Sequence, residues 1–167
     1  MRVAILVVSD RASRGQRADA SGPALEAHLK ATGWVVTNME IVPDEHGMIR
    51  DKLLDWVEQD VADLILTTGG TGFAPRDVTP EATRAVIERE APGLAEAMRS
   101  ASLLISPHAM LSRARAGIRR STLIVNLPGS PKGALENLEV ILPALDHAVQ
   151  LLRGSPDAES GHSKAAV

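Results

Sequence analysis

Short uninterrupted apolar runs are the feature that most constrains the fold of this chain. Residues 3–8, 64–66 and 122–127 are mostly apolar, and segments with helical periodicity separate them. Strands of this kind are typical of parallel sheets that are covered by helices on both faces. The pattern therefore predicts an α/β fold with a mainly parallel sheet.

Capping residues and prolines mark where helices are expected to begin. Ser21, Asp44, Thr79 and Ser130 each precede an amphipathic segment and can cap it. A polar loop is expected over 11–20 and an edge strand over 34–42, where polarity is mixed. The predicted helices are 21–33, 44–57, 79–90, 94–105 and 130–152, the last with a bend at Pro143.

The length of 167 residues suits one compact domain, which we place at residues 1–153. Residues 154–167 contain no large apolar residue before Val167, and we expect a disordered tail there. No apolar run approaches the about 18 residues that a membrane helix needs. The short run 3–8 is followed at once by polar residues, so we interpret it as a first strand of a cytoplasmic protein rather than a signal peptide.

Composition excludes several classes of function. The chain has no cysteine, which excludes disulfides, thiolate nucleophiles and iron–sulfur clusters. Its net charge is −3, and its aromatic residues are Trp34, Trp56 and Phe73 alone, so we expect no nucleic-acid binding. The five histidines show no metal-ligand spacing, and Ser9 and Ser130 have no histidine partner nearby in sequence. We assign no role to the histidines and no covalent nucleophile to the chain.

A glycine-rich loop follows the apolar run 64–66. Three glycines in residues 69–72 allow backbone N–H groups to converge on a phosphate without a Cβ in the way. A mobile turn that needs positive φ is an equally good explanation of the triplet alone. The loop lacks the lysine of a P-loop, and Pro75 stands where a dinucleotide fingerprint needs its third glycine.

Two aspartates stand beside such loops. Asp77 lies between the glycine loop and the expected helix start at Thr79, where a carboxylate repels phosphates unless a cation intervenes. Mg²⁺ suits that place, because it is usually held by one or two carboxylates and substrate phosphates. Asp77 capping a turn is the alternative. Asp44 is more simply a helix cap, but it would share the ion if its strand lay close to that of Asp77.

Two further loops follow predicted strands. Residues 126–132 open a helix with free amides and a lysine, Lys132, which suits an anion. Asn126 interrupts an apolar run, so it should have a buried partner or face the site. Residues 9–11 follow the first strand, and ligands of open parallel sheets bind beyond such strand ends. Among the arginines near 113–120, which we expect to be mostly solvated, Arg113 is the candidate for function.

Together these segments resemble the molybdopterin adenylyltransferases of molybdenum cofactor biosynthesis, the MogA/MoaB family. The resemblance covers most of the chain, in several motifs that occur in order. They are Val8-Ser9-Asp10-Arg11-Ala12-Ser13, Pro43-Asp44-Glu45, residues 67–72, Arg76-Asp77-Val78-Thr79-Pro80-Glu81-Ala82-Thr83, Pro92-Gly93-Leu94-Ala95-Glu96, Leu111-Ser112-Arg113 and Asn126-Leu127-Pro128-Gly129-Ser130-Pro131-Lys132.

The resemblance implies a three-layer α/β/α domain that forms a homotrimer in the cytoplasm and contacts other proteins of the pathway. It implies Mg²⁺-dependent transfer of AMP from ATP to the terminal phosphate of molybdopterin, with release of pyrophosphate. The family's catalytic, metal-holding aspartates fall on Asp44 and Asp77. The expected substrate-binding residues are Ser9, Asp10, Arg11, Gly69, Gly70, Thr71, Gly72, Arg113, Asn126, Pro128, Gly129, Ser130 and Lys132.

Two other functions remain open at this point. A MoaB-type paralogue would bind molybdopterin, or act as a scaffold, without catalysis. A competence-damage-type relative would keep the fold and hydrolyse nucleotide pyrophosphates, although such proteins usually carry a further domain. The presence of both Asp44 and Asp77 favours the transferase.

Overall fold

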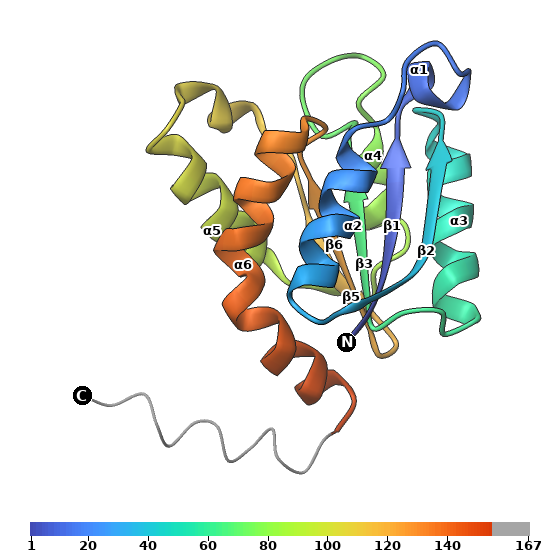
Figure 1. Cartoon of the computed structure of the whole chain (residues 1–167), viewed down its shortest axis with the longest axis vertical. Helices are drawn as coiled ribbons and strands as arrows, with labels where there is room; N and C mark the ends of the chain where they lie inside the picture. Colours follow the sequence, from blue (N-terminus) through green and yellow to red (C-terminus); the bar gives the residue numbers. More distant parts are fainter. Residues whose placement is uncertain (155–167) are drawn as a thin grey trace.

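A computed structural model describes residues 1–154 of the chain and shows one six-stranded sheet between helices (Figure 1). The strand order is β2-β1-β3-β6-β5-β4; the first four strands are parallel, and β5 and β4 are antiparallel additions. The predicted mainly parallel sheet is thus confirmed. The strands are β1 (Arg2–Val8), β2 (Val35–Val42), β3 (Leu64–Thr68), β4 (Arg89–Glu90), β5 (Ala116–Arg119) and β6 (Thr122–Leu127).

Helices cover both faces of the sheet, which gives the three layers. One face packs against α2, α5 and α6, and the other against α3 and α4. The helices are α1 (Asp10–Ser13), α2 (Ser21–Ala31), α3 (His46–Glu58), α4 (Thr79–Arg84), α5 (Pro92–Leu103), the 3-10 helix η1 (Pro107–Leu111) and α6 (Pro131–Leu152). None of the helices within residues 1–154 combines the length and apolarity that a membrane crossing requires.

Successive side chains of the central strands point to opposite faces of the sheet, so the hydrophobic core consists of two parts. Ile5 of β1 points to the α2/α6 side and packs with Leu25 and Leu138, whereas Leu6 points to the α3/α4 side with Leu53 and Trp56. Each of these side chains is at most 2% exposed. Because both faces are buried, the central strands are apolar at most positions, which explains the apolar runs in the sequence.

The parallel strands end together at one edge of the sheet. Val8 is paired with Val42, Val7 with Thr68, and Thr68 with Leu127, so the loops after β2, β1, β3 and β6 emerge side by side. In Figure 1 this edge is at the top, where α1 and the loop before α4 also lie. The topology therefore brings the predicted loops 9–11, 67–72 and 126–132 and the Asp44 segment to one place.

Several predicted elements differ from the structure. The helix expected over 79–90 ends at Arg84, because Glu88 and Ala91 donate backbone hydrogen bonds to β5 and residues 89–90 form β4. The loop expected over 11–20 contains α1, which Ser9 caps. Strand β5 is not predicted from the sequence, because four residues are too few to show a clear strand periodicity.

Three of the four expected helix caps are also wrong. Asp19 accepts hydrogen bonds from Ser21 N and Gly22 N and so takes the capping role expected of Ser21. Thr79 lies inside α4, and the side chain of Asp44 bonds elsewhere. Ser130 does cap α6 through Gly133 N, and α6 continues through Pro143. The tail prediction falls on 155–167 and lies outside the described residues.

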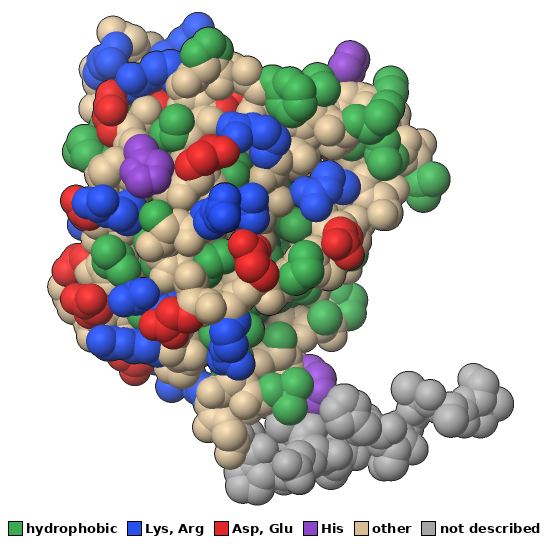
Figure 2. Space-filling view, turned by 180° about the vertical axis from the view of Figure 1, so that it is seen from behind, with side chains coloured by type: hydrophobic (Ala, Val, Ile, Leu, Met, Phe, Trp, Pro, Cys, Tyr) green, Lys and Arg blue, Asp and Glu red, His purple; other side chains and the backbone are tan. Residues whose placement is uncertain are grey.

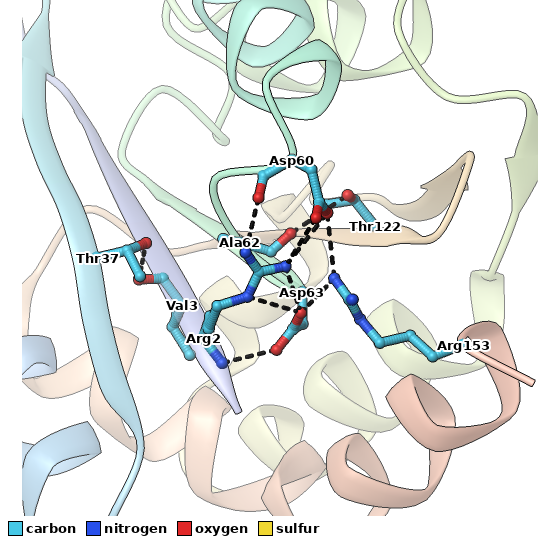
Figure 3. A network of polar contacts seen from close by, with 8 residues as sticks. All are labelled: Arg2, Val3, Thr37, Asp60, Ala62, Asp63, Thr122 and Arg153. Atoms are coloured by element: carbon cyan, nitrogen blue, oxygen red, sulfur yellow. Dashed lines mark hydrogen bonds and ion pairs between the residues drawn. The ribbon is translucent and has the colours of Figure 1, made fainter. Parts of the chain in front are cut away.

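A polar cluster ties the opposite edge of the sheet together (Figure 3). Asp63, which is 7% exposed, accepts hydrogen bonds from the backbone N and the guanidinium of Arg2. Arg153, just after α6, forms ion pairs with Asp63 and with Asp60, which also pairs with Arg2. The cluster joins the start of β1, the turn before β3 and the end of α6, far along the strands from the predicted site.

Candidate active site

The glycine loop has a backbone that other residues cannot follow. Gly69 has φ +105°, and a Cβ placed on it would lie 2.2 Å from the carbonyl oxygen of Val8. Gly70 has φ +63°, and its Cβ would lie 2.4 Å from Thr79 Oγ1. The Thr79 hydroxyl in turn donates to the Gly69 carbonyl at 2.8 Å. The loop is therefore fixed by close contacts, which argues against the alternative that it is merely a mobile turn.

The loop after β6 is held against the glycine loop. Thr68 Oγ1 donates to the Pro128 carbonyl at 2.7 Å, and Ser21 Oγ donates to the Gly129 carbonyl at 2.8 Å. Ser130 then caps α6, a helix of 22 residues. The start of α6, where Lys132 N donates no hydrogen bond within residues 1–154, and the glycine loop thus lie at the same edge of the sheet.

Asp44 and Asp10 bind each other reciprocally, the backbone N–H of each donating to the carboxylate of the other. Asp10 N donates to Asp44 Oδ2 at 2.7 Å, and Asp44 N donates to Asp10 Oδ1 at 3.3 Å. Burial raises the pKa of Asp44 above its ordinary value, against the lowering effect of the Asp10 N–H. The negative charges of Asp10 and Asp77 raise the pKa of Asp44 further.

Asp77 lies beside the same glycine loop as Asp44. Its Oδ2 accepts a hydrogen bond from Ala74 N at 2.9 Å and would lie 2.9 Å from a Cβ on Gly72. Asp44 Oδ1 would lie 3.0 Å from a Cβ on Gly70. The two carboxylates therefore lie beside Gly70 and Gly72 of one loop, and the charge of Asp77 raises the pKa of Asp44. The segment of Asp44 thus does lie close to the loop that precedes Asp77, as the sharing of one metal ion would require.

The two aspartates fit a magnesium ion only together with a substrate. Within residues 1–154, no three His, Cys, Asp or Glu side chains form a ready-made metal site. Each aspartate, however, uses Oδ2 for a backbone hydrogen bond and makes none through Oδ1 in the described chain. Mg²⁺ commonly takes one or two carboxylate oxygens and completes its shell with phosphate oxygens and water. A cation here would also offset the repulsion that raises the pKa of Asp44.

Two cavities open on either side of the glycine loop. One, of about 210 Å³, is lined by residues that include Ser9, Asp44, Gly70 and Gly129. The other, of about 360 Å³, is lined by residues that include Thr71, Gly72, Ser112, Pro128 and Ser130. The glycine loop and the loop after β6 contribute to both, so two ligands could meet over these loops.

Arg113 holds the glycine loop rather than facing the cavities as a free cation. Its Nε donates to the Gly72 carbonyl at 2.7 Å, its Nη2 donates to the Asp77 carbonyl, and its Nη1 pairs with Glu81. Arg113 N also donates to the Thr71 carbonyl at 2.9 Å. Each of its guanidinium nitrogens makes one of these contacts, so Arg113 positions the glycine loop, and its expected role of neutralising phosphate charge stays a prediction.

Asn126 is the second candidate whose surroundings differ from expectation. Its side chain is fully buried and donates to Thr67 Oγ1 at 2.9 Å and to Thr83 Oγ1 at 2.8 Å. Its Oδ1 accepts from Arg115 N at 3.1 Å. The expected buried partner is present, but a substrate contact through this side chain is not available.

The remaining candidates lie at the edges of the site. Ser9 lines the smaller cavity. Lys132, whose side chain is 83% exposed, lies 3.7 Å from Glu136 at the start of α6, and Arg11 is exposed on α1. Neither Lys132 nor Arg11 lines either of the two cavities. A ligand that extends out of a cavity would be needed to reach them.

The other arginines of this region are paired on the surface. Arg115 pairs with Glu90 and Arg119 with Glu88. Lys and Arg side chains are mixed with Asp and Glu over the face shown in Figure 2, so no patch of a single sign forms there. The expectation that most of these arginines are solvated is met only by Arg120, whereas Arg113, Arg115 and Arg119 are half-buried. Arg76 is different, because it reaches Asp10 beside the site, and its sequence neighbours gave no signal for that contact.

The comparisons with known proteins agree with this geometry. The family described as "Probable molybdopterin binding domain" matches residues 4–147. A molybdopterin adenylyltransferase of Helicobacter pylori strain J99 is 43% identical over 157 residues, which cover 93% of this chain and 89% of that protein. Gephyrin of Dictyostelium discoideum is 46% identical over 97% of this chain, but the chain spans only 24% of its length.

Solved structures are similar over the whole sheet and its helices. The molybdopterin biosynthesis enzyme MoaB from Thermus thermophilus is 54% identical, with a TM-score of 0.87, and the match covers 93% of this chain and 98% of that one.

Proposed function

The chain belongs to the molybdopterin-binding domain family of molybdenum cofactor biosynthesis, and from that premise we propose that it transfers AMP from ATP to the terminal phosphate of molybdopterin. Pyrophosphate is the second product. The observation that carries the proposal is the pair Asp44 and Asp77, whose carboxylates lie beside Gly70 and Gly72 of one glycine loop that borders two cavities. Two anionic substrates and one cation suit that arrangement.

The reaction needs positioning more than acid–base chemistry. An oxygen of the molybdopterin phosphate attacks the α-phosphorus of ATP and forms a new O–P bond. The bond between that phosphorus and the oxygen bridging to the β-phosphate breaks, and pyrophosphate leaves with the electron pair. The attacking oxygen is already ionised near neutral pH, so no protein base is required. This agrees with a chain that has no cysteine.

The protein's own groups have separate tasks in this proposal. Asp44 and Asp77 would hold Mg²⁺, which supplies neutralisation of charge on the phosphates. The amides of residues 70–72 and of Lys132 would orient phosphate oxygens. Ser9 borders the smaller cavity, and Asp10 binds Asp44 beside it. Lys132 and Arg11 line neither cavity and would attract the anions from outside them. Arg113 keeps Gly72 and Asp77 in place.

The first test measures pyrophosphate release from ATP and Mg²⁺, with and without molybdopterin. Release that depends on molybdopterin supports the transferase. Binding of molybdopterin without release would instead favour a binding paralogue. Release without any pterin would favour a pyrophosphate hydrolase. Asp77→Asn should keep its melting temperature and lower the chemical step by about 10²-fold, as for a lost preorganised charge.

The proposal extends to a cytoplasmic homotrimer that receives molybdopterin from other proteins of its pathway. Support for self-association comes from large apolar side chains exposed at the end of α5 and on η1, where green side chains gather at the upper right of Figure 2. Leu104 is 90% exposed and Ile105 is 68% exposed. Sedimentation should give a mass about three times 17.7 kDa, and a mass near 17.7 kDa at micromolar protein would refute the trimer.

A further inference from the structure

Arg76 joins three loops of the site by a fork of hydrogen bonds. Its Nε donates to Asp10 Oδ2 at 2.9 Å, and its Nη2 donates to Asp10 Oδ1 at 2.9 Å. The same Nη2 donates to Glu45 Oε1 at 2.8 Å. Arg76 thus links the loop after β3 to the loops after β1 and β2.

These contacts connect the two aspartates of the site. Arg76 precedes Asp77 in the chain, and the Asp10 carboxylate that it binds also accepts a hydrogen bond from Asp44 N. Asp10 N returns a hydrogen bond to Asp44 Oδ2 at 2.7 Å. A continuous path of contacts therefore runs from the segment of Asp77 through Arg76 and Asp10 to Asp44.

Charge gives Arg76 a second task. Asp10, Asp44, Glu45 and Asp77 would together oppose the approach of a polyphosphate. Arg76 forms ion pairs with Asp10 and Glu45, the two that contact or adjoin Asp44, while Asp44 and Asp77 form no ion pair within residues 1–154. Arg76 thereby compensates the negative charges of Asp10 and Glu45, which are not expected to bind the metal ion.

We propose that Arg76 is a positioning residue that sets Asp44 relative to Asp77 and compensates Asp10 and Glu45. The inference rests on the proposed nucleotidyl transfer for its kinetic consequences, but its structural part does not. Arg76 is not a catalytic residue in this proposal, because its guanidinium is occupied by Asp10 and Glu45 and it lines neither cavity.

Arg76→Lys separates the two tasks. Lysine keeps the positive charge but has no planar fork to bind both oxygens of Asp10. We expect Arg76→Lys to retain a KM for ATP within about 3-fold of wild type and to lower kcat about 10- to 100-fold, as for other groups that orient metal ligands. Arg76→Gln should lower kcat equally and also raise the KM for ATP, because the charge is lost.

The matched control is Arg50→Gln. Arg50 is another exposed arginine, on α3, and it pairs with Asp51 away from both cavities. Its loss should change neither kcat nor KM. A loss of kcat in Arg76→Lys that is accompanied by an equal loss of folded protein, measured by thermal melting, would show a merely structural role and overturn the proposal. So would a wild-type kcat in Arg76→Lys.

Crystal structures of the variants give a measurement that needs no activity. In Arg76→Gln, the contact between Asp10 N and Asp44 Oδ2 should lengthen or break, and Asp44 should be displaced relative to Asp77. A contact that stays at 2.7 Å overturns the positioning role. If wild-type protein releases no pyrophosphate, the proposed function fails, and the crystallographic result still decides the role of Arg76.

Discussion

Gly69 and Gly129 touch through their backbones. A Cβ placed on Gly129 would lie 3.0 Å from the Cα of Gly69, so the loops after β3 and β6 approach as closely as main chains can. Gly69 is enclosed on its other side by the Val8 carbonyl, 2.2 Å from where its own Cβ would be. The strand-end loops of β1, β3 and β6 therefore form one contiguous backbone surface, which is what a phosphate cradle requires.

Gly69→Ala should disrupt this surface. Alanine at φ +105° is strained, and its Cβ would collide with the main chain of Val8, which cannot move without distorting β1. We expect a loss of about 3 kcal/mol or more in the free energy of unfolding, measured by urea denaturation.

Gly47→Ala is the matched control for that change. Gly47 lies in α3 with no atom within 4 Å of a new Cβ, so alanine should stabilise the protein by about 0.4–1 kcal/mol. If both substitutions change stability by the same amount, the close contact at Gly69 is not what holds the loop.

Periodicity and topology rules predicted most of the fold and that the candidate loops would lie at one edge of the sheet. Central strands, the edge position of β2 and the strand-end loops follow from local pattern and from the geometry of parallel sheets. The roles of Arg113 and Asn126 did not follow, because their partners lie 32 to 59 residues away or on the main chain. Arg76 was missed for the same reason, since its ion pair with Asp10 spans 66 residues. Long-range pairing leaves no periodic signal in a single sequence.

Asp63 should make the free energy of unfolding depend on pH in the acidic range. Burial alone would raise its pKa, but hydrogen bonds from Arg2 and the charges of Arg153 and Arg2 outweigh burial and lower it (Figure 3). A lowered folded-state pKa means that the carboxylate stabilises the fold above the unfolded pKa, and that this contribution is lost as pH falls through the folded pKa. Asp63→Asn should therefore cost about 1–3 kcal/mol near neutral pH and progressively less in acid.

Thermal melting between about pH 7 and pH 3 checks this dependence. Asp51→Asn is the control, because Asp51 makes only an exposed pair with Arg50 and should contribute less than about 1 kcal/mol. Parallel melting curves for wild type and Asp63→Asn across the whole range would contradict the predicted linkage.

Asn126→Ala should weaken the fold without weakening substrate binding. The substitution leaves Arg115 N without its acceptor and removes two bonds to buried threonine hydroxyls, so we expect a loss of about 2 kcal/mol or more. The KM for ATP, measured below the melting temperature, should stay within about 3-fold of wild type. Asn38→Ala on the edge strand β2 is the control, with an expected change within about 0.5 kcal/mol. A large rise in KM with unchanged stability would restore Asn126 as a substrate contact.

Asp44→Asn should separate stability from function. The raised pKa of Asp44 means that the folded state holds a proton more readily than the unfolded state, so stability falls as pH rises through the folded pKa. Asparagine removes the ionised carboxylate but can still accept the hydrogen bond from Asp10 N. The variant should melt at a higher temperature than wild type near neutral pH, and the advantage should vanish in acid, where Asp44 is protonated.

Activity should move in the opposite direction in that variant. If Asp44 shares the metal ion with Asp77, Asp44→Asn should lower kcat by about 10²-fold and raise the Mg²⁺ concentration needed for half-maximal rate. Two carboxylates held close together destabilise the folded protein until a cation and substrate bind. A variant that loses one of these carboxylates is therefore expected to be more stable and less active. A variant that melts higher yet keeps the Mg²⁺ dependence of the wild type would show that Asp44 supports the loop of Asp10 and takes no part in holding the ion.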